Sequence, residues 1–138
     1  MRVVLDTNIF IGACLGAGAA NAVLAACLRR QFQALMGTSL LAEHEAVMGR
    51  QALFVSCRLS PSEREELLDI YLGVCEWTRV YYTWRPNVQD ESDNHVLELA
   101  IAGGADFLVS RNHKDFRAME LRFPQLRLVT PESFLKEL

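Results

Sequence analysis

Acidic and amide side chains follow three of the strands that the sequence predicts. Asp6 comes directly after the apolar run Val3 to Leu5, in the segment RVVLDTNIF. A carboxylate at the end of a buried strand needs a partner, because burying an isolated charge costs far more than the packing of one residue returns. The alternative is that Asp6 only hydrogen-bonds the turn that follows it. The other residues of this kind are Asp90, Glu91, Asp93, Asn112 and Asp115.

This set of residue types indicates a divalent cation. Carboxylates that converge on one pocket repel each other, and a shared proton or a bound cation relieves the repulsion. Few basic residues lie next to these acids, which favours the cation. Oxygen ligands from Asp, Glu and Asn suit Mg²⁺ or Mn²⁺, whereas zinc would want His or Cys at matching spacing. His44, His95 and His113 form no such set, so each is expected to be an ordinary surface or packing residue.

Helical periodicity bears on three more carboxylates. Asp93 lies on the apolar stripe of a helix predicted over 92–104 and should face inward, although it would also serve as a helix cap. Glu43 and Glu45 lie on opposite flanks of the apolar stripe of an earlier helix, at 38–50. Periodicity does not choose between these two glutamates, and most glutamates on helix flanks are solvated.

The elements that must position these residues alternate between strand-like and helix-like patterns, which is typical of an α/β domain with a mostly parallel sheet. Strands are predicted over residues 3–5, 32–37, 78–84, 106–110 and 126–130. Helices are predicted over residues 19–30, 38–50, 60–77, 92–104, 114–123 and 131–138. Ligands of open parallel sheets bind beyond the carboxyl ends of the strands, so this topology would gather the acids into one site.

Two helix starts are specified by capping residues. The helix predicted over 60–77 begins with Ser60 and has Glu63 three residues later, which is a capping box. The preceding helix is expected to be capped by Thr38 or Ser39.

Composition indicates one globular domain over residues 1–138. A chain of 138 residues with 51% hydrophobic residues can bury a core, and no low-complexity stretch suggests a linker. No apolar run approaches the length of a membrane span and no signal peptide is recognisable, so we expect a cytoplasmic protein without a membrane partner. The four cysteines are isolated, which predicts reduced thiols. The net charge is -3, but twelve of the fourteen basic residues are Arg, which suits phosphate binding.

Four segments in order resemble the PIN domain, and especially bacterial PIN proteins of the VapC-like toxin kind. They are VVLDTNIF, SLLAEHEAV, DESDNHVLELAIAGGADFLVSRNHKDF and LVTPESFL, and they span Val3 to Leu135. The resemblance implies a three-layer α/β/α domain around a mostly parallel sheet of about five strands. It also implies a ribonuclease whose acidic residues hold one or two divalent ions, Mg²⁺ or Mn²⁺. Such an ion would polarise the scissile phosphodiester and lower the pKa of a water.

Carried over by position, the resemblance assigns the catalytic acids that would bind the metal. These acids are Asp6, Glu43 rather than Glu45, Asp93 and Asp115. Asn112 is a further expected ligand, although many PIN domains have an aspartate there, and its neutral amide puts the affinity for a second ion in doubt.

The resemblance also assigns residues that support the acids or bind the substrate. Thr7 and Asn8 match the residues that follow the first aspartate, and Ser110 stands where the family often has a threonine. Single-stranded RNA is the expected substrate. The candidates for holding its backbone are Arg111, Lys114 and Arg117.

A VapC-like protein would bind an antitoxin and would form a homodimer. Two other interpretations stay open. The chain would be a catalytically weak or inactive PIN domain that binds RNA or a partner protein, since a fold does not guarantee activity. A haloacid-dehalogenase-type phosphatase is a weaker alternative, because that mechanism needs an aspartate two residues after the first and this chain has Asn8.

Overall fold

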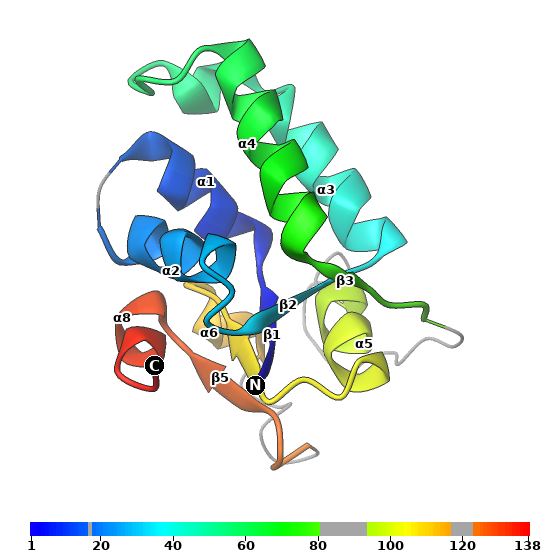
Figure 1. The fold of residues 1–138 in the computed structure, drawn as a ribbon. Helices are drawn as coiled ribbons and strands as arrows, with labels where there is room; N and C mark the ends of the chain where they lie inside the picture. The colour runs from blue at the N-terminus through cyan, green and yellow to red at the C-terminus, as the bar shows by residue number, and fades with distance from the viewer. Residues whose placement is uncertain (17, 81–93, 117–122) are drawn as a thin grey trace.

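A five-stranded parallel sheet forms the centre of the computed structural model, which describes residues 1–16, 18–80, 94–116 and 123–138. The strand order is β3-β2-β1-β4-β5 (Figure 1). All four pairings between neighbouring strands are parallel, as the alternating pattern predicts. The strands are β1 (Arg2–Leu5), β2 (Gln33–Met36), β3 (Glu76–Trp77), β4 (Phe107–Val109) and β5 (Arg127–Val129).

Helices flank the sheet on both sides, as expected for the three-layer α/β/α architecture. In Figure 1, α2 and α8 lie on one side of the strands and α5 lies on the other, while α3 and α4 project beyond the sheet. The described helices are α1 (Thr7–Leu15), α2 (Ala19–Leu28), α3 (Thr38–Met48), the 3₁₀ helix η1 (Gln51–Phe54), α4 (Pro61–Val74), α5 (Asn94–Ala102), α6 (His113–Phe116) and α8 (Pro131–Leu135).

The strand order reverses between β1 and β4, and this reversal places the site. The chain moves outward from β1 through β2 to β3, and then returns to β4 and β5 on the other side of β1. Leu5 and Val109 are partners at the carboxyl ends of β1 and β4. Asp6 continues this pairing, since its backbone N–H donates to the Val109 carbonyl at 3.0 Å. The residues that follow β1 and β4 therefore meet at the switch point where ligands of open sheets bind.

Burial explains why β1 is a continuous apolar run rather than an alternating one. Val3 and Val4 are fully buried and Leu5 is nearly so, because helices cover both faces of the central strands. Where α5 returns to the sheet the backbone comes very close to β2. A Cβ on Gly103 would lie 2.5 Å from Leu35 Cδ1, and Gly104 follows with a φ of +63°. These two glycines end α5, as the sequence indicates.

The structure corrects three local predictions. A helix, α1, follows Asp6 where the sequence showed only an apolar run. The strand predicted over 78–84 is not found at residues 78–80, and residues 81–84 lie outside the described residues. The structure has a strand, β3, at Glu76–Trp77, where the sequence predicted the end of a helix. The α3 helix is capped by the backbone of Gly37 rather than by a side chain of Thr38 or Ser39, since both hydroxyl residues are already inside the helix.

The capping box of α4 is confirmed. The Ser60 hydroxyl accepts a hydrogen bond from the Glu63 N–H, and the Glu63 carboxylate accepts one from the Ser60 N–H. The helix ends at Val74, three residues before the predicted end.

The cysteines and the helix lengths agree with the expectations from composition. All four cysteines are free, and burial raises the pKa of Cys14 to about 11 and that of Cys27 to about 12. These two thiols are therefore unreactive. No single helix among the described residues is long and apolar enough to cross a membrane, and the consecutive pair α1 and α2, which together would be, is bent by 104°.

Candidate active site

Asp6 is held by three donors at the switch point of the sheet. It is the N-cap of α1, and its Oδ1 accepts a hydrogen bond from the Thr7 N–H at 2.8 Å. Its Oδ2 accepts from the Ser110 hydroxyl at 2.7 Å and from Asn8 Nδ2 at 3.3 Å. Only 3% of the Asp6 surface is exposed. Asp6 therefore does hydrogen-bond the turn that follows it, but it is also held by Ser110 from the end of β4, and the three bonds orient this buried carboxylate.

Ser110 connects Asp6 to the loop that follows β4. Its hydroxyl accepts a hydrogen bond from the Asn112 N–H at 2.9 Å, and Asn8 Nδ2 lies 3.4 Å from it. The Asn8 carbonyl oxygen accepts from the Arg111 N–H at 3.4 Å. The predicted supporting residues Asn8 and Ser110 thus tie the start of α1 to the end of β4 around the Asp6 carboxylate.

Glu43 approaches the same edge of the sheet from α3. Its carboxylate forms a hydrogen-bonded ion pair with Nε2 of His95, which lies in the first turn of α5. The side chain of Glu43 is 31% exposed and that of His95 is 17% exposed. Glu45 is exposed and lines a groove between α3 and α4 instead. Of the two glutamates that periodicity left open, Glu43 is therefore the one that points toward Asp6.

Electrostatics shows that Asp6 and Glu43 interact. Burial raises the pKa of Asp6, and the charge of Glu43 raises it further, against the lowering effect of the hydrogen bond from Ser110. Burial also opposes ionisation of Glu43, but the hydrogen bond and charge of His95 outweigh it, so the pKa of Glu43 is lowered. The carboxylates of Asp6 and Glu43 thus interact across the site, and the imidazole of His95 contacts that of Glu43.

The sequence predicts His95 to be an ordinary surface or packing residue, and the structure places it against the carboxylate of Glu43. The residue lies 52 positions from Glu43 in the chain, so no local pattern links the two. The only signal was its position two residues after Asp93, within an acidic segment. His44, in contrast, is a packing residue as predicted, because its buried ring contacts Phe10 and Tyr71.

The described residues at the site offer oxygen donors, which are the kind that a hard cation prefers. They contain no cluster of three or more His, Cys, Asp or Glu side chains that would hold a metal, so Asp6 and Glu43 are the two carboxylates in place. The hydroxyl of Thr7 is buried, and no group in the described ranges completes a hydrogen bond of standard geometry with it. It nevertheless lies near enough to Glu43 to help lower the pKa of that residue. Two carboxylates and a buried hydroxyl form an oxygen-only donor set, which fits Mg²⁺ or Mn²⁺.

The remaining predicted site residues lie partly outside the description. Asp93 and Arg117 are outside the described residues. Lys114 and Asp115 belong to α6, but only their backbone is described. Asn112 is half-buried next to Ser110, beside the Asp6 carboxylate.

Arg111, one of the residues expected to hold RNA, is engaged by another side chain. Its guanidinium forms a bidentate ion pair with Glu132 of α8, with N–O distances of 3.1 and 2.9 Å. Both side chains are about half exposed, and such pairs add little stability. Arg111 would therefore have to exchange this carboxylate for a phosphate.

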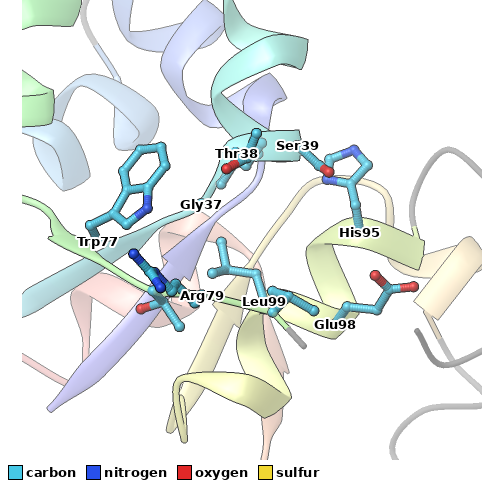
Figure 2. A pocket seen from close by; sticks show the side chains of 11 residues that line it. Gly37, Thr38, Ser39, Trp77, Arg79, His95, Glu98 and Leu99 are labelled. Atoms are coloured by element: carbon cyan, nitrogen blue, oxygen red, sulfur yellow. The ribbon is translucent and has the colours of Figure 1, made fainter. Parts of the chain in front are cut away.

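A cleft of about 460 Å³ opens beside the acids, between the start of α3, the segment after β3 and α5. Figure 2 shows Trp77 and Arg79 at one end of it and His95 and Glu98 at the other. His95 is shared between this cleft and the ion pair with Glu43. The sequence carried no signal for Trp77 or Arg79, because Trp77 fell at the end of a predicted helix and Arg79 in a predicted strand, whereas Trp77 ends β3 and Arg79 follows it.

Comparisons with known proteins agree with this geometry. The family model described as PIN domain matches residues 2–114. The fold is similar to a chain in the crystal structure of VapBC2 from Rickettsia felis bound to a DNA fragment from their promoter, with a TM-score of 0.61 and 20% sequence identity. That match covers 94% of this chain and 98% of the other, and it shows the shared fold. A comparison with curated proteins finds no significant match.

Proposed function

Because the chain belongs to the PIN domain family, we propose that it is a divalent-metal-dependent endoribonuclease that hydrolyses phosphodiester bonds of single-stranded RNA. The observation that carries the proposal is the buried carboxylate of Asp6, fixed by three donors at the switch point and facing Glu43. Burial raises the pKa of Asp6 and the charge of Glu43 raises it further, so the two carboxylates repel each other, and a bound cation would relieve that repulsion.

The residues that would hold the ion are Asp6 and Glu43, together with the predicted ligands Asp93, Asp115 and Asn112. When bound, Mg²⁺ or Mn²⁺ supplies polarisation of the scissile phosphodiester and a lowered pKa for the attacking water. Thr7, Asn8 and Ser110 keep the Asp6 carboxylate in one orientation, and this precision matters because Mg²⁺ demands near-octahedral order.

His95 holds the Glu43 carboxylate on the α5 side of the site. The ion pair fixes the side chain of Glu43 before a metal binds, and the half-buried position limits the water that reaches it. His95 is therefore a positioning residue in this proposal.

The proposal extends to a role as the toxin of a toxin–antitoxin pair in the cytoplasm. Its support is the likeness of the fold to a chain of the VapBC2 structure, together with the sequence resemblance to VapC-like proteins. The partner would be an antitoxin protein, and the chain would form a homodimer.

The test uses two neighbouring glutamates of one helix. Labelled RNAs of mixed sequence would be incubated with the protein in EDTA, Mg²⁺ or Mn²⁺, beside the variants Asp6→Asn, Glu43→Gln and Glu45→Gln. We expect cleavage that needs the metal, is lost in Asp6→Asn and Glu43→Gln, and is retained in Glu45→Gln, since Glu45 faces away from the site. Asp93→Asn, checked by circular dichroism, tests the ligand that lies outside the described residues.

Two results would contradict the proposal. Cleavage that survives both Asp6→Asn and Glu43→Gln would place the activity elsewhere or in a contaminant. Thermal stabilisation by Mg²⁺ that requires Asp6 and Glu43, without cleavage of any RNA, would favour the inactive PIN domain that binds a partner.

A further inference from the structure

The cleft beside the acids has two chemically different ends. Trp77 and Arg79, from the carboxyl end of β3 and the segment after it, line one end, and His95 and Glu98 of α5 line the other (Figure 2). The carboxylate of Glu43 lies directly behind His95, because the two side chains form an ion pair. The cleft therefore leads from an aromatic and basic end to the acidic site.

Trp77 is an exposed aromatic surface at the edge of the sheet. It is the last residue of the edge strand β3, and 52% of its surface is exposed. A half-exposed indole at the rim of a cleft is available for contact with a ligand, and tryptophan offers a large contact surface. Its flat ring suits stacking on a nucleic-acid base.

Arg79 is exposed on the same side of the cleft and forms no ion pair with any residue in the described ranges. Arg2, Arg111 and Arg127 are paired with Glu76, Glu132 and Glu137, whereas Arg29, Arg30, Arg50 and Arg58 are exposed and, like Arg79, form no ion pair within the described ranges. Arg79 differs from these unpaired arginines because it lines the cleft. A guanidinium without a carboxylate partner, two residues from an exposed indole, is available for a phosphate.

We propose that this cleft binds the single-stranded RNA substrate on one side of the scissile bond, with a base stacked on Trp77 and a backbone phosphate bound by Arg79. The inference rests on the proposed nuclease function. In this arrangement the RNA strand runs along the cleft from Arg79 past Leu99 toward His95 and the acids. The carboxylates of Asp6 and Glu43 would repel an RNA phosphate unless a cation is bound between them, whereas the Trp77 end would hold the RNA without a metal.

The first experiment uses Trp77 as its own reporter. The chain has two tryptophans, so Trp84→Phe leaves Trp77 as the sole one. The protein is titrated with a short single-stranded RNA in EDTA, which prevents cleavage. The Trp77 fluorescence should be quenched over the same RNA concentrations at which binding changes the anisotropy of a fluorescein label on the RNA. Double-stranded RNA of the same sequence should not quench it, because its bases are already stacked.

The second experiment measures affinity in variants. Trp77→Ala should weaken binding of the single-stranded RNA about tenfold to hundredfold, which corresponds to one base stack. Arg79→Gln should reduce the slope of log K against log salt concentration by about 0.7, which corresponds to one phosphate contact on a single strand. Ile70→Ala and Arg58→Gln remove an exposed apolar residue and an exposed arginine outside the cleft, and both should bind like the parent.

The outcomes separate this inference from the nuclease proposal. In one outcome RNA is cleaved or bound without quenching of Trp77, while Trp77→Ala and Arg79→Gln bind RNA with the affinity of the parent. This result contradicts RNA binding in the cleft and leaves the nuclease proposal standing. Quenching and weakened variants without any cleavage support the cleft and contradict the nuclease. Equal quenching by double-stranded RNA overturns base stacking, and a protein that binds no RNA overturns both proposals.

Discussion

The hydroxyl of Ser110 donates a 2.7 Å hydrogen bond to Asp6 Oδ2, and this bond joins the residue after β4 to the residue after β1. The two are 104 positions apart in the sequence and are neighbours only because the strand order reverses between β1 and β4. Ser110 is fully buried, so the bond is shielded from water. One short contact thus orients the central carboxylate of the candidate site and connects the two halves of the sheet.

Replacement of Ser110 by alanine should damage both stability and activity. The variant removes a hydrogen bond to a buried carboxylate, which is worth about 2 kcal/mol of unfolding free energy. It also raises the pKa of Asp6 further, since this bond now lowers it. Chemical denaturation measures the first effect and RNA cleavage the second. Ser110→Thr keeps the hydroxyl and should keep the activity, so equal loss of activity in both variants would contradict a role through the hydrogen bond.

Asp6 should make the stability of the metal-free protein depend on pH. Its pKa in the folded state is raised by burial and by Glu43, so the protonated form contributes stability below about pH 4, and this stability is lost as pH rises through the raised pKa. The unfolding free energy of the native protein in EDTA should therefore fall between pH 4 and pH 7 relative to that of Asp6→Asn. Denaturation of both proteins at the two pH values measures the difference.

Bound Mg²⁺ should offset the loss of folding stability that the charge of Asp6 causes in the metal-free protein. A ligand that binds only the folded state stabilises it by about 2.7 kcal/mol at a free concentration about a hundredfold above Kd. We expect Mg²⁺ to raise the melting temperature of the native protein and not that of Asp6→Asn. Asp69→Asn, a change at an exposed residue of α4 in the groove between α3 and α4, serves as the control and should respond like the native protein. An equal response of Asp6→Asn would exclude Asp6 as a ligand.

Much of the sheet was predictable because its strands are buried on both faces. The apolar runs that form β1, β4 and β5 must be buried in a small domain, so they were recognisable as strands. The position of Asp6 at the edge of the sheet then follows from the parallel topology. The α1 helix was not predictable in the same way, since the segment TNIFIGACL is apolar on nearly every side and shows no amphipathic period. Its start is set by the Asp6 cap.

Contacts distant in sequence account for what the pattern missed. The position of β3 depends on its partner, since Leu35 and Met36 pair with Glu76 and Trp77, whereas the β-forming residues that follow predicted a later strand. The contact of His95 with Glu43 likewise depends on how α3 and α5 pack at the sheet edge. Periodicity left Glu43 and Glu45 equal, and only the tertiary arrangement separates them.

His95 should control the ionisation of Glu43. Burial raises the pKa of this carboxyl group, and the hydrogen bond and charge of His95 lower it below its ordinary value. The variant His95→Ala removes this hydrogen bond and charge. Burial then has the largest effect, so the pKa of Glu43 should rise. Carboxyl ¹³C chemical shifts followed over pH measure it directly. His113→Ala removes a histidine from α6 instead, and an equal rise in that variant would show that the contact is not the cause.

His44 should make the protein less stable in mild acid. Its ring is buried between Phe10 and Tyr71, and Nδ1 lies 2.8 Å from the Leu40 carbonyl oxygen. Burial lowers the pKa of His44, against the raising effect of that carbonyl. The neutral ring therefore contributes stability above about pH 6.5, and this stability is lost as pH falls through the lowered pKa.

The variant His44→Phe keeps an aromatic ring in the same place and removes the titrating group. At pH 8 its unfolding free energy should lie within about 1 kcal/mol of the native value, because it loses one hydrogen bond and one buried nitrogen that has no partner in the described ranges. As the pH falls from about 6.5 toward the lowered pKa, the variant should become more stable relative to the native protein, by up to about 1.4 kcal/mol for each pH unit, and the difference should level off below the lowered pKa. Urea denaturation between pH 8 and pH 5 measures this. A difference between the two proteins that stays constant over that range would show that His44 does not titrate on unfolding.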